Sequence, residues 1–180
     1  MIEITWGALR AIEPTPDELA RYAPLLAEGY NHPANAPLMG HTQIITPPEV
    51  VESYVSSIAD GMRAFLFFDG NDFCGDGDLR NFRGATAEFA FMIAAPNAQG
   101  KGLGTQFATM VHAFGFQTLD RIYASVVPAN TASLRVFHKL GYTVDESPEG
   151  RAYAEEPGDI TLSLARATFT APSEIQCRMR

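Results

Sequence analysis

Two neighbouring stretches decide the fold of this 180-residue chain: TAEFAFMIAAPNAQGKGLGTQFATMVHAFGF (residues 86–116) and RIYASVVPANTASLRVFHKLGY (residues 121–142). In the first, apolar residues predict a strand over residues 88–94, and the glycine-punctuated run at residues 99–105 leads directly into a helix. In the second, residues 122–127 predict another strand, which also leads into a helix. Both stretches therefore predict strand, loop and helix units.

The glycine-rich run of the first stretch predicts an anion site. The first turn of a helix has backbone N–H groups without an intrahelical partner and carries partial positive charge, so a bound phosphate satisfies those groups. Gly100, Gly102 and Gly104 have no side chains to keep a phosphate from the backbone, and Lys101 adds a cation. We expect a pyrophosphate to bind here.

Two common nucleotide-binding motifs do not fit the same residues. A P-loop needs G-x-x-x-x-G-K-[ST], but Lys101 is followed by Gly102, and Ala95 stands five positions before Gly100. The dinucleotide fingerprint needs G-x-G-x-x-G, whereas the glycines here fall as G-x-G-x-G. The sequence therefore excludes both motifs.

A third pattern does fit. Gln99, Gly102 and Gly104 form Q-x-x-G-x-G after a strand that ends in Ala-Pro, and residues 130–142 read N-x-x-S-x-R-V-F-x-K-L-G-Y. Together the two blocks resemble the GNAT N-acetyltransferase superfamily over about a third of the chain. The second block is most similar in wording to the branch that contains ribosomal-protein N-terminal acetyltransferases.

The resemblance implies a function and an alternative. The function is transfer of an acetyl group from acetyl-CoA to a primary amine, on a peptide N-terminus or a small molecule, by direct attack in a ternary complex. The alternative, from a different class, is a non-catalytic acyl-CoA-binding or regulatory domain of the same fold. Release of thiol from acetyl-CoA distinguishes the two.

The resemblance also implies the fold class, a mixed α/β (α+β) fold. We expect a twisted, mostly antiparallel sheet of six to seven strands with helices on both faces, and the cofactor lying where strands 88–94 and 122–127 separate. The length predicts one domain. We place it over residues 1–167 and interpret residues 168–180, which carry no pattern, as a loose C-terminal tail.

The remaining pattern predicts further elements. Capping signals, each a Thr followed by Pro and by Glu three residues later, start helices at Thr15 and Thr46. The second helix has its apolar residues on one face: Val50, Val51, Tyr54, Val55 and Ile58. Strands are expected over residues 2–12, 63–68, 73–79, 142–146 and 159–165, and helices over residues 102–119 and from Asn130 to Gly141. In the family, the loop at residues 30–41 helps to wall the acceptor site.

The resemblance implies three groups of cofactor-binding residues. The strand end is expected to bond the pantetheine arm through its backbone, at Met92, Ile93 and Ala94. The loop is expected to hold the pyrophosphate, with Gln99, Gly100, Lys101, Gly102, Leu103, Gly104 and Thr105. The second helix unit contributes Asn130, Ser133 and Phe137.

Glu88 is the candidate catalytic base, because it is the only ionisable side chain between Thr86 and Pro96 and carboxylates are rarely buried without a reason. Many family members have a Glu near this point. Burial would raise the pKa of such a carboxyl towards a useful value. The alternative interpretation is a structural carboxylate paired with Arg80 or Arg83.

Asn130 is a good N-cap for its helix. In the family the matching Asn also contacts the cofactor or a water near the thioester, which makes it the second candidate catalytic residue. Many members carry a Tyr as general acid where this chain has Phe137. An acid must then be Tyr142, or Ser133 through water, or be absent, since a thiol with a pKa of about 8.5 leaves without help.

Net charge and the distribution of apolar residues indicate which classes of partner to expect. The net charge of −8 argues against nucleic-acid binding and favours a cationic amine substrate. The chain lacks an apolar run of the roughly 20 residues that a membrane helix needs, so we expect a cytoplasmic protein without a membrane partner. A homodimer is left open. The histidines are scattered and are predicted to lie on the surface or in loops: His32, His41, His112 and His138.

Metal binding is not expected. Cys74 and Cys177 lie far apart, which gives no metal spacing and no disulfide framework. The acidic run at residues 69–78 lacks the ligand and the glycine of a calcium loop, because Phe73 and Cys74 occupy those positions. We interpret that run as a hairpin turn with its strand ends.

Overall fold

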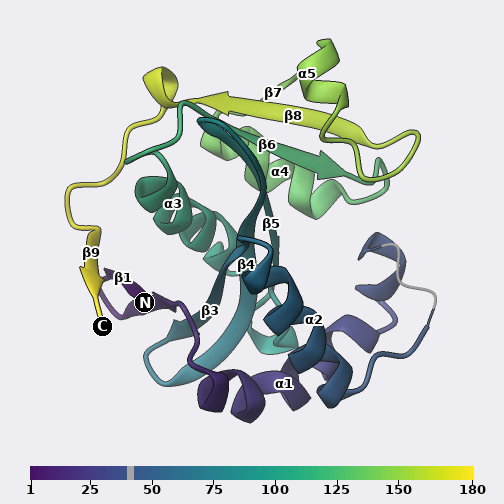
Figure 1. Cartoon of the computed structure of the whole chain (residues 1–180), viewed down its shortest axis with the longest axis vertical. Coiled ribbons are helices and arrows are strands. Elements are labelled where there is room, and N and C mark those ends of the chain that lie inside the picture. The colour runs from purple at the N-terminus through teal and green to yellow at the C-terminus, as the bar shows by residue number, and fades with distance from the viewer. Residues whose placement is uncertain (40–42) are drawn as a thin grey trace.

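A computed structural model of the protein describes residues 1–39 and 43–180 and shows a twisted sheet with helices on both faces (Figure 1). Within those residues the strand order is β7-β8-β6-β5-β4-β3-β2-β1-β9. Neighbouring strands are antiparallel except β5 and β6, which are parallel. The predicted fold class is confirmed.

The strands of the sheet are β1 (Ile2–Trp6), β2 (Leu9–Ile12), β3 (Arg63–Asp69), β4 (Asp72–Arg83), β5 (Thr86–Met92), β6 (Arg121–Val126), β7 (Thr143–Val144), β8 (Ile160–Ala165) and β9 (Gln176–Met179). The α-helices are α1 (Pro16–Asn31), α2 (Pro47–Ala59), α3 (Leu103–Gly115), α4 (Thr131–Leu140) and α5 (Pro148–Arg151). Short 3₁₀ helices follow as η1 (Ala36–Met39), η2 (Pro96–Ala98) and η3 (Arg166–Thr168).

The sheet has nine strands within the described residues, so the predicted six to seven is wrong in two places. Residues 2–12 form two strands rather than one, because the chain reverses at Gly7, where φ is +60° and a glycine adopts the left-handed region without cost. Residues 176–179 form β9, which pairs with β1. The tail is therefore not loose: its backbone hydrogen-bonds to an otherwise open sheet edge.

The first two helices begin as predicted. The hydroxyl of Thr15 accepts from the Glu18 N–H at 3.1 Å, and the Glu18 carboxylate accepts from the Thr15 N–H at 2.9 Å, which completes a capping box. In α2, however, Val55 and Ile58 are 54% and 41% exposed. The apolar face predicted for this helix is therefore buried only in part, at Val50 and Tyr54.

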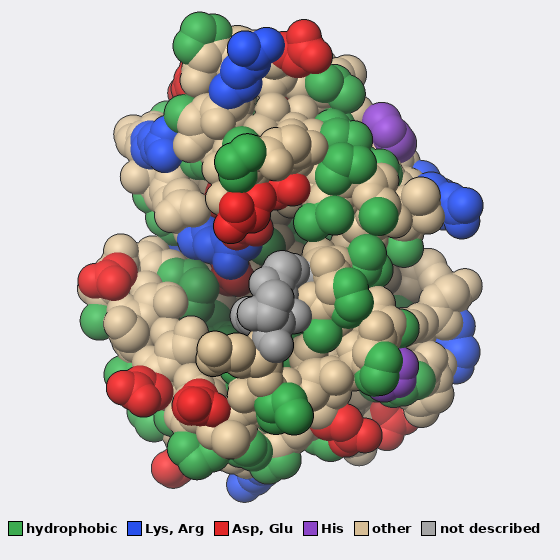
Figure 2. Space-filling model, turned by 90° about the vertical axis from the view of Figure 1, so that its right-hand side faces the viewer, with side chains coloured by type: hydrophobic (Ala, Val, Ile, Leu, Met, Phe, Trp, Pro, Cys, Tyr) green, Lys and Arg blue, Asp and Glu red, His purple; other side chains and the backbone are tan. Residues whose placement is uncertain are grey.

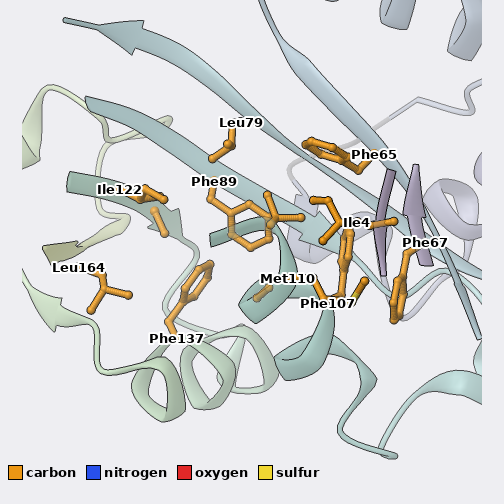
Figure 3. Close-up of a cluster of buried hydrophobic side chains, with 14 of the residues drawn as sticks. Ile4, Phe65, Phe67, Leu79, Phe89, Phe107, Met110, Ile122, Phe137 and Leu164 are labelled. Atoms are coloured by element: carbon orange, nitrogen blue, oxygen red, sulfur yellow. The ribbon is translucent and has the colours of Figure 1, made fainter. Parts of the chain in front are cut away.

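Different helices pack on the two faces of the sheet. Helices α3 and α4 pack on one face over the larger apolar core, where side chains such as Phe89, Phe107 and Met110 interdigitate (Figure 3). Helices α1 and α2 cover the β2 to β4 part of the opposite face with a second cluster around Leu26 and Leu66. No helix in the described part of the chain is long and apolar enough to cross a membrane.

The parallel strands β5 and β6 separate along their length. They pair only from Thr86 opposite Arg121 to Glu88 opposite Tyr123, after which β6 stays with β8 and β5 stays with β4. The separation predicted for these two strands is confirmed. It opens the sheet at residues 89–92, beside the start of α4.

Candidate active site

A cleft with a volume of about 300 Å³ opens where β5 and β6 separate. Its walls come from β4, β5, the end of β6 and the start of α4, with Tyr30 and Leu38 on one side and residues 155–159 on the other. Figure 2 shows a hollow in the middle of this face, with acidic and basic side chains gathered at it. Of the loop predicted to wall an acceptor site, Tyr30 and Leu38 thus line the cleft, whereas His41 lies outside the described residues.

The glycine-rich loop has the geometry of an anion cradle. Gly100 and Gly102 have φ angles of +74° and +83°, and a side chain at Gly102 would point into open space. In the part of the chain that the structure describes, the N–H groups of residues 100–104 donate no hydrogen bond. Because these groups surround the start of α3, they can receive a phosphate oxygen together with the helix dipole.

The loop lies next to the cleft. A Cβ atom at Gly104 would stand 3.0 Å from the ring of Phe91, which lines the cleft, and 3.6 Å from Val136 of α4. Gly104 therefore serves the close packing of α3 on the sheet. Gln99 fixes the loop to the strand end, because its side-chain amide donates to the Ile93 carbonyl at 2.8 Å.

The start of α4 forms the opposite wall. Asn130 is the N-cap, and its Oδ1 accepts from the Ser133 N–H at 3.1 Å, as predicted for a cap. Asn130, Ser133 and Phe137 all line the cleft. The Phe137 ring is 3% exposed and lies 5.9 Å from the Phe91 ring in an edge-on contact, so it carries no hydroxyl into the cleft but closes its inner end.

The three residues at the end of the strand, Met92, Ile93 and Ala94, have different surroundings. Met92 lines the cleft, whereas Ala94 borders a second hollow of about 140 Å³ beside Gly29 and Pro96. The carbonyl of Ile93 already accepts from Gln99. Of the three residues predicted to bond the pantetheine arm, only Met92 is thus placed on the cleft wall.

Glu88 is buried but does not line the cleft in the described structure. One carboxylate oxygen accepts from the Asn81 amide at 2.7 Å, and the other lies 3.5 Å from the Arg80 guanidinium. Burial raises the pKa of Glu88, and Arg80 acts in the opposite direction. The ion pair with Arg80 is the structural alternative that the sequence left open, whereas Arg83 instead donates to the Ala152 carbonyl at 3.0 Å.

Tyr142 lies away from the cleft. Its hydroxyl is bonded to His112 Nε2 at 2.6 Å, and the side chain is 2% exposed. The prediction that His112 lies on the surface is wrong: it is fully buried on the inner face of α3, where its Nδ1 contacts the Ala108 carbonyl at 2.6 Å. Burial lowers the pKa of His112 to about 4.

The sequence missed two carboxylates that line the cleft, Asp76 and Asp78. They stand at alternate positions of β4 with Arg80, so the three side chains share one face. They were missed because the acidic run at residues 69–78 was interpreted as a hairpin turn with its strand ends. The available signal was the Asp-Gly-Asp-Leu-Arg alternation, which puts three charges on one side of a predicted strand.

Asp76 is held by two tyrosines. Tyr30 of α1 donates to Asp76 Oδ2 at 2.5 Å, and Tyr54 of α2 donates to the same oxygen. Burial raises the pKa of Asp76 to about 6, while the two hydroxyl donors act in the opposite direction. Helices α1 and α2 thus fix one buried carboxylate on the wall of the cleft.

The cleft is acidic. Among the described residues that line it, Arg80 is the one cation, and five carboxylates accompany it: Asp76, Asp78, Glu155, Glu156 and Asp159. Arg80 donates to Glu155 at 2.6 Å, so its charge is already shared. No three His, Cys, Asp or Glu side chains in the described structure are grouped so that they could hold a metal ion. The five carboxylates therefore give the cleft negative charge that suits a cationic ligand.

Comparison with known proteins agrees with this geometry. Residues 9–143 match the family model of the acetyltransferase (GNAT) domain. An N-acetyltransferase 9-like protein of Nematostella vectensis is 37% identical over 86 residues, which are 47% of this chain and 40% of that protein, so the match spans well under half of the relative's length.

Two solved structures show the same fold. Spermidine N-acetyltransferase of Vibrio cholerae, in complex with CoA and spermine, has a TM-score of 0.70 at 19% identity, over 89% of this chain and 96% of that one. Ribosomal-protein-S5-alanine acetyltransferase of Vibrio fischeri has a TM-score of 0.71 at 17% identity, over 93% and 98%. With a family model that matches most of its length, this chain belongs to the GNAT acetyltransferase family.

Proposed function

We propose that this protein transfers an acetyl group from acetyl-CoA to a primary amine by direct attack in a ternary complex. The observation that carries the proposal is the loop at residues 100–104, whose unbonded N–H groups open beside the cleft between β5 and β6. That loop holds the pyrophosphate, and Lys101 adds charge. The membership of the GNAT family supports the assignment.

The remaining contacts to acetyl-CoA follow from the cleft. The thioester lies between β5 and the start of α4, beside Met92, Asn130 and Ser133. The amine nitrogen attacks the carbonyl carbon, a C–N bond forms, and the C–S bond breaks to release CoA thiol. The Phe137 ring excludes water from the inner end of the cleft.

The acceptor is a cationic amine. Five carboxylates and one guanidinium line the described part of the cleft, and Arg80 is already paired. An acceptor with two or more ammonium groups gains more from this field than a neutral amine. The fold likeness to a spermidine acetyltransferase agrees with this acceptor class, and a peptide N-terminus is the second acceptor to test.

A non-catalytic acyl-CoA-binding domain is the alternative function. Two observations favour it: Phe137 has no hydroxyl, and the hydroxyl of Tyr142 is buried against His112. A thiol with a pKa of about 8.5 nevertheless leaves without an acid, so acetyl transfer remains the function that we propose.

The test is release of free thiol from acetyl-CoA with a panel of monoamines, diamines, polyamines and short peptides. Gly102→Glu puts a carboxylate where the phosphate binds and should abolish release. Gly61→Glu is the matched control, because Gly61 also has a positive φ of +99° with open space around it but lies at the end of α2. Release should be greatest with polycations and should survive in the control.

One result would overturn the assignment. If acetyl-CoA raises the melting temperature of the wild-type protein but no amine releases thiol, the protein binds the cofactor without transferring the acetyl group. The acyl-CoA-binding alternative would then replace the proposed enzyme.

A further inference from the structure

The charged side chains of β4 form a row on one wall of the cleft. Residues opposite each other in antiparallel strands share a face of the sheet, and the pairs here are Asp78 with Ala90 and Arg80 with Glu88. Asp78 and Arg80 line the cleft, but Glu88 does not. The row therefore presents a β4 carboxylate, not the β5 one, to a molecule in the cleft.

Exposure separates the two carboxylates. The side chain of Asp78 is 14% exposed, whereas that of Glu88 is 1% exposed. Ala90, opposite Asp78, has only a methyl group, so no bulky side chain covers the carboxylate from β5. Asp78 Oδ1 is buried, lies 3.7 Å from Arg80 Nε and accepts no hydrogen bond within the described residues, so the exposed part of the side chain is its other atoms. An acceptor amine in the cleft can therefore reach Asp78.

Arg80 pairs with Glu88 as well as with Asp78, but Glu88 is the more deeply buried of the two carboxylates. It lies 3.5 Å from the Arg80 guanidinium, and the same guanidinium nitrogen donates to Glu155 at 2.6 Å. Arg80, which stands opposite Glu88, lines the cleft, whereas Glu88 does not. Glu88 is therefore placed to fix the guanidinium.

We propose that Asp78 takes the proton from the ammonium group of the acceptor, and that Glu88 positions Arg80. This inference rests on the proposed acetyl transfer. Asp78 is a catalytic residue in this scheme, because it touches the reacting nitrogen. Asp76, held by Tyr30 and Tyr54, supplies a fixed carboxylate about 7 Å further along the strand.

The protons balance. An acceptor enters as R–NH₃⁺, and the Asp78 carboxylate removes one proton to give R–NH₂ and a carboxylic acid. The amine attacks the thioester carbon, the C–S bond breaks, and the second proton of the nitrogen goes to the departing sulfur. Asp78 then releases its proton to solvent. One acetamide, one CoA thiol and one proton result.

The surroundings suit Asp78 to this task near neutral pH. Burial raises the pKa of Asp78 to about 7, and the Arg80 guanidinium acts against that rise. Carboxylates face it from three elements and add to the rise: Asp76 of β4, Glu88 of β5 and Glu155 before β8. Tyr30 of α1 faces the same group. A general base is most effective when its pKa lies near the working pH.

The test compares kcat against pH for the full chain, with saturating acetyl-CoA and the best acceptor from the amine panel. Wild-type kcat should rise through an inflection near pH 7 and then level. Asp78→Asn should lower kcat at pH 7.5 by about 100-fold or more and remove the inflection, with the KM for acetyl-CoA unchanged. Asp78→Glu should recover part of the rate.

Glu88→Gln is the discriminating variant, and it should keep the inflection. Because Asp78→Asn could also alter the packing, a second variant is measured. In Asp78→Ala, added formate should restore part of kcat, which would not happen if the side chain had only a structural role. If Asp78→Asn keeps the inflection and rate, Asp78 is not the base although the enzyme assignment stands. If Glu88→Gln alone loses the inflection, Glu88 is the base. If wild type releases no thiol, the proposed function itself fails.

Discussion

Asp78 has an energetic cost for the folded protein that follows from the same surroundings. A carboxyl whose pKa is higher in the folded than in the unfolded state binds its proton more tightly when folded. Burial raises the pKa of Asp78 from 3.8 to about 7. The contribution of Asp78 to the free energy of unfolding is therefore most favourable below about pH 4. It declines as the pH rises to 7 and stays at its lowest value above that.

Asp78→Asn should therefore stabilise the protein at alkaline pH. An amide of the same shape needs no ionisation, so we expect the free energy of unfolding at pH 8 to rise by on the order of 2–4 kcal/mol, with the gain vanishing near pH 4. Urea unfolding at pH 4, 6 and 8 measures this. Glu156→Gln, which replaces an exposed carboxylate of the same cleft, should change little at any pH. A loss of stability at pH 8 would contradict the raised pKa.

Two single residues show what the sequence could reveal at this scale. Asn130 has a local partner, the Ser133 N–H three residues away, and its capping role was predicted. His112 has its partner Tyr142 thirty residues away, joined to it only by the packing of α3. Local hydrogen bonds can be predicted from neighbouring residues, whereas burial of a polar side chain depends on what folds over it.

At the scale of elements, α4 packs on the larger core through Phe137 and through the partly buried Leu134, Val136 and Leu140. The structure describes every residue of α4, and only Phe137 among them is fully buried. Its ring makes edge-on contacts with Phe89, Phe91 and Tyr142. The position of Asn130 on the cleft wall therefore depends on Phe137.

Phe137→Ala should destabilise the protein by about 3–5 kcal/mol, because it removes a buried ring and leaves a cavity between α4 and β5. Thermal or urea unfolding measures the loss. Arg135→Ala is the matched control on the exposed side of the same helix and should change stability by less than about 0.5 kcal/mol. Equal effects of the two substitutions would show that the ring does not anchor α4.

The elements themselves could largely be predicted. Capping boxes, glycine stops and apolar spacing are local signals, and they correctly predicted the starts of α1, α2 and α4. The charged row of β4 was missed because its meaning depends on β5 and α1, which lie beside it only in the folded sheet. A strand shows which residues share a face, but not what that face meets.

At the scale of the whole molecule, the two ends of the described chain meet in the sheet. Strand β9 pairs with β1, and Arg178 contacts the buried Glu3 carboxylate at 2.7 Å. Arg180 reaches Glu18 of α1 at 2.6 Å. The C-terminal strand therefore covers an edge of the sheet and neutralises a buried carboxylate.

A variant that ends at residue 172 should be less stable by roughly 2–4 kcal/mol, because it loses the β1–β9 hydrogen bonds and leaves Glu3 with only Arg10, at 3.9 Å. Urea unfolding measures the loss, and size-exclusion chromatography should show association through the uncovered β1 edge. Adding Glu3→Gln to the shortened variant should recover part of the loss. Unchanged stability would show that β9 contributes nothing to folding.

The sequence by itself determined the family, the glycine-rich loop and most elements, because these follow from residues close together in the chain. The loop and the start of α3 are contiguous from Gln99 to Thr105, so the spacing of these residues in the chain already predicts the local geometry. Only the tertiary structure decided that Asp78 lines the cleft and Glu88 does not, because the register of β4 and β5 sets Glu88 opposite Arg80 and Asp78 opposite the small Ala90. The physical reason is that desolvation and charge pairing act through space, and the distances between side chains of different strands exist only once the sheet has formed.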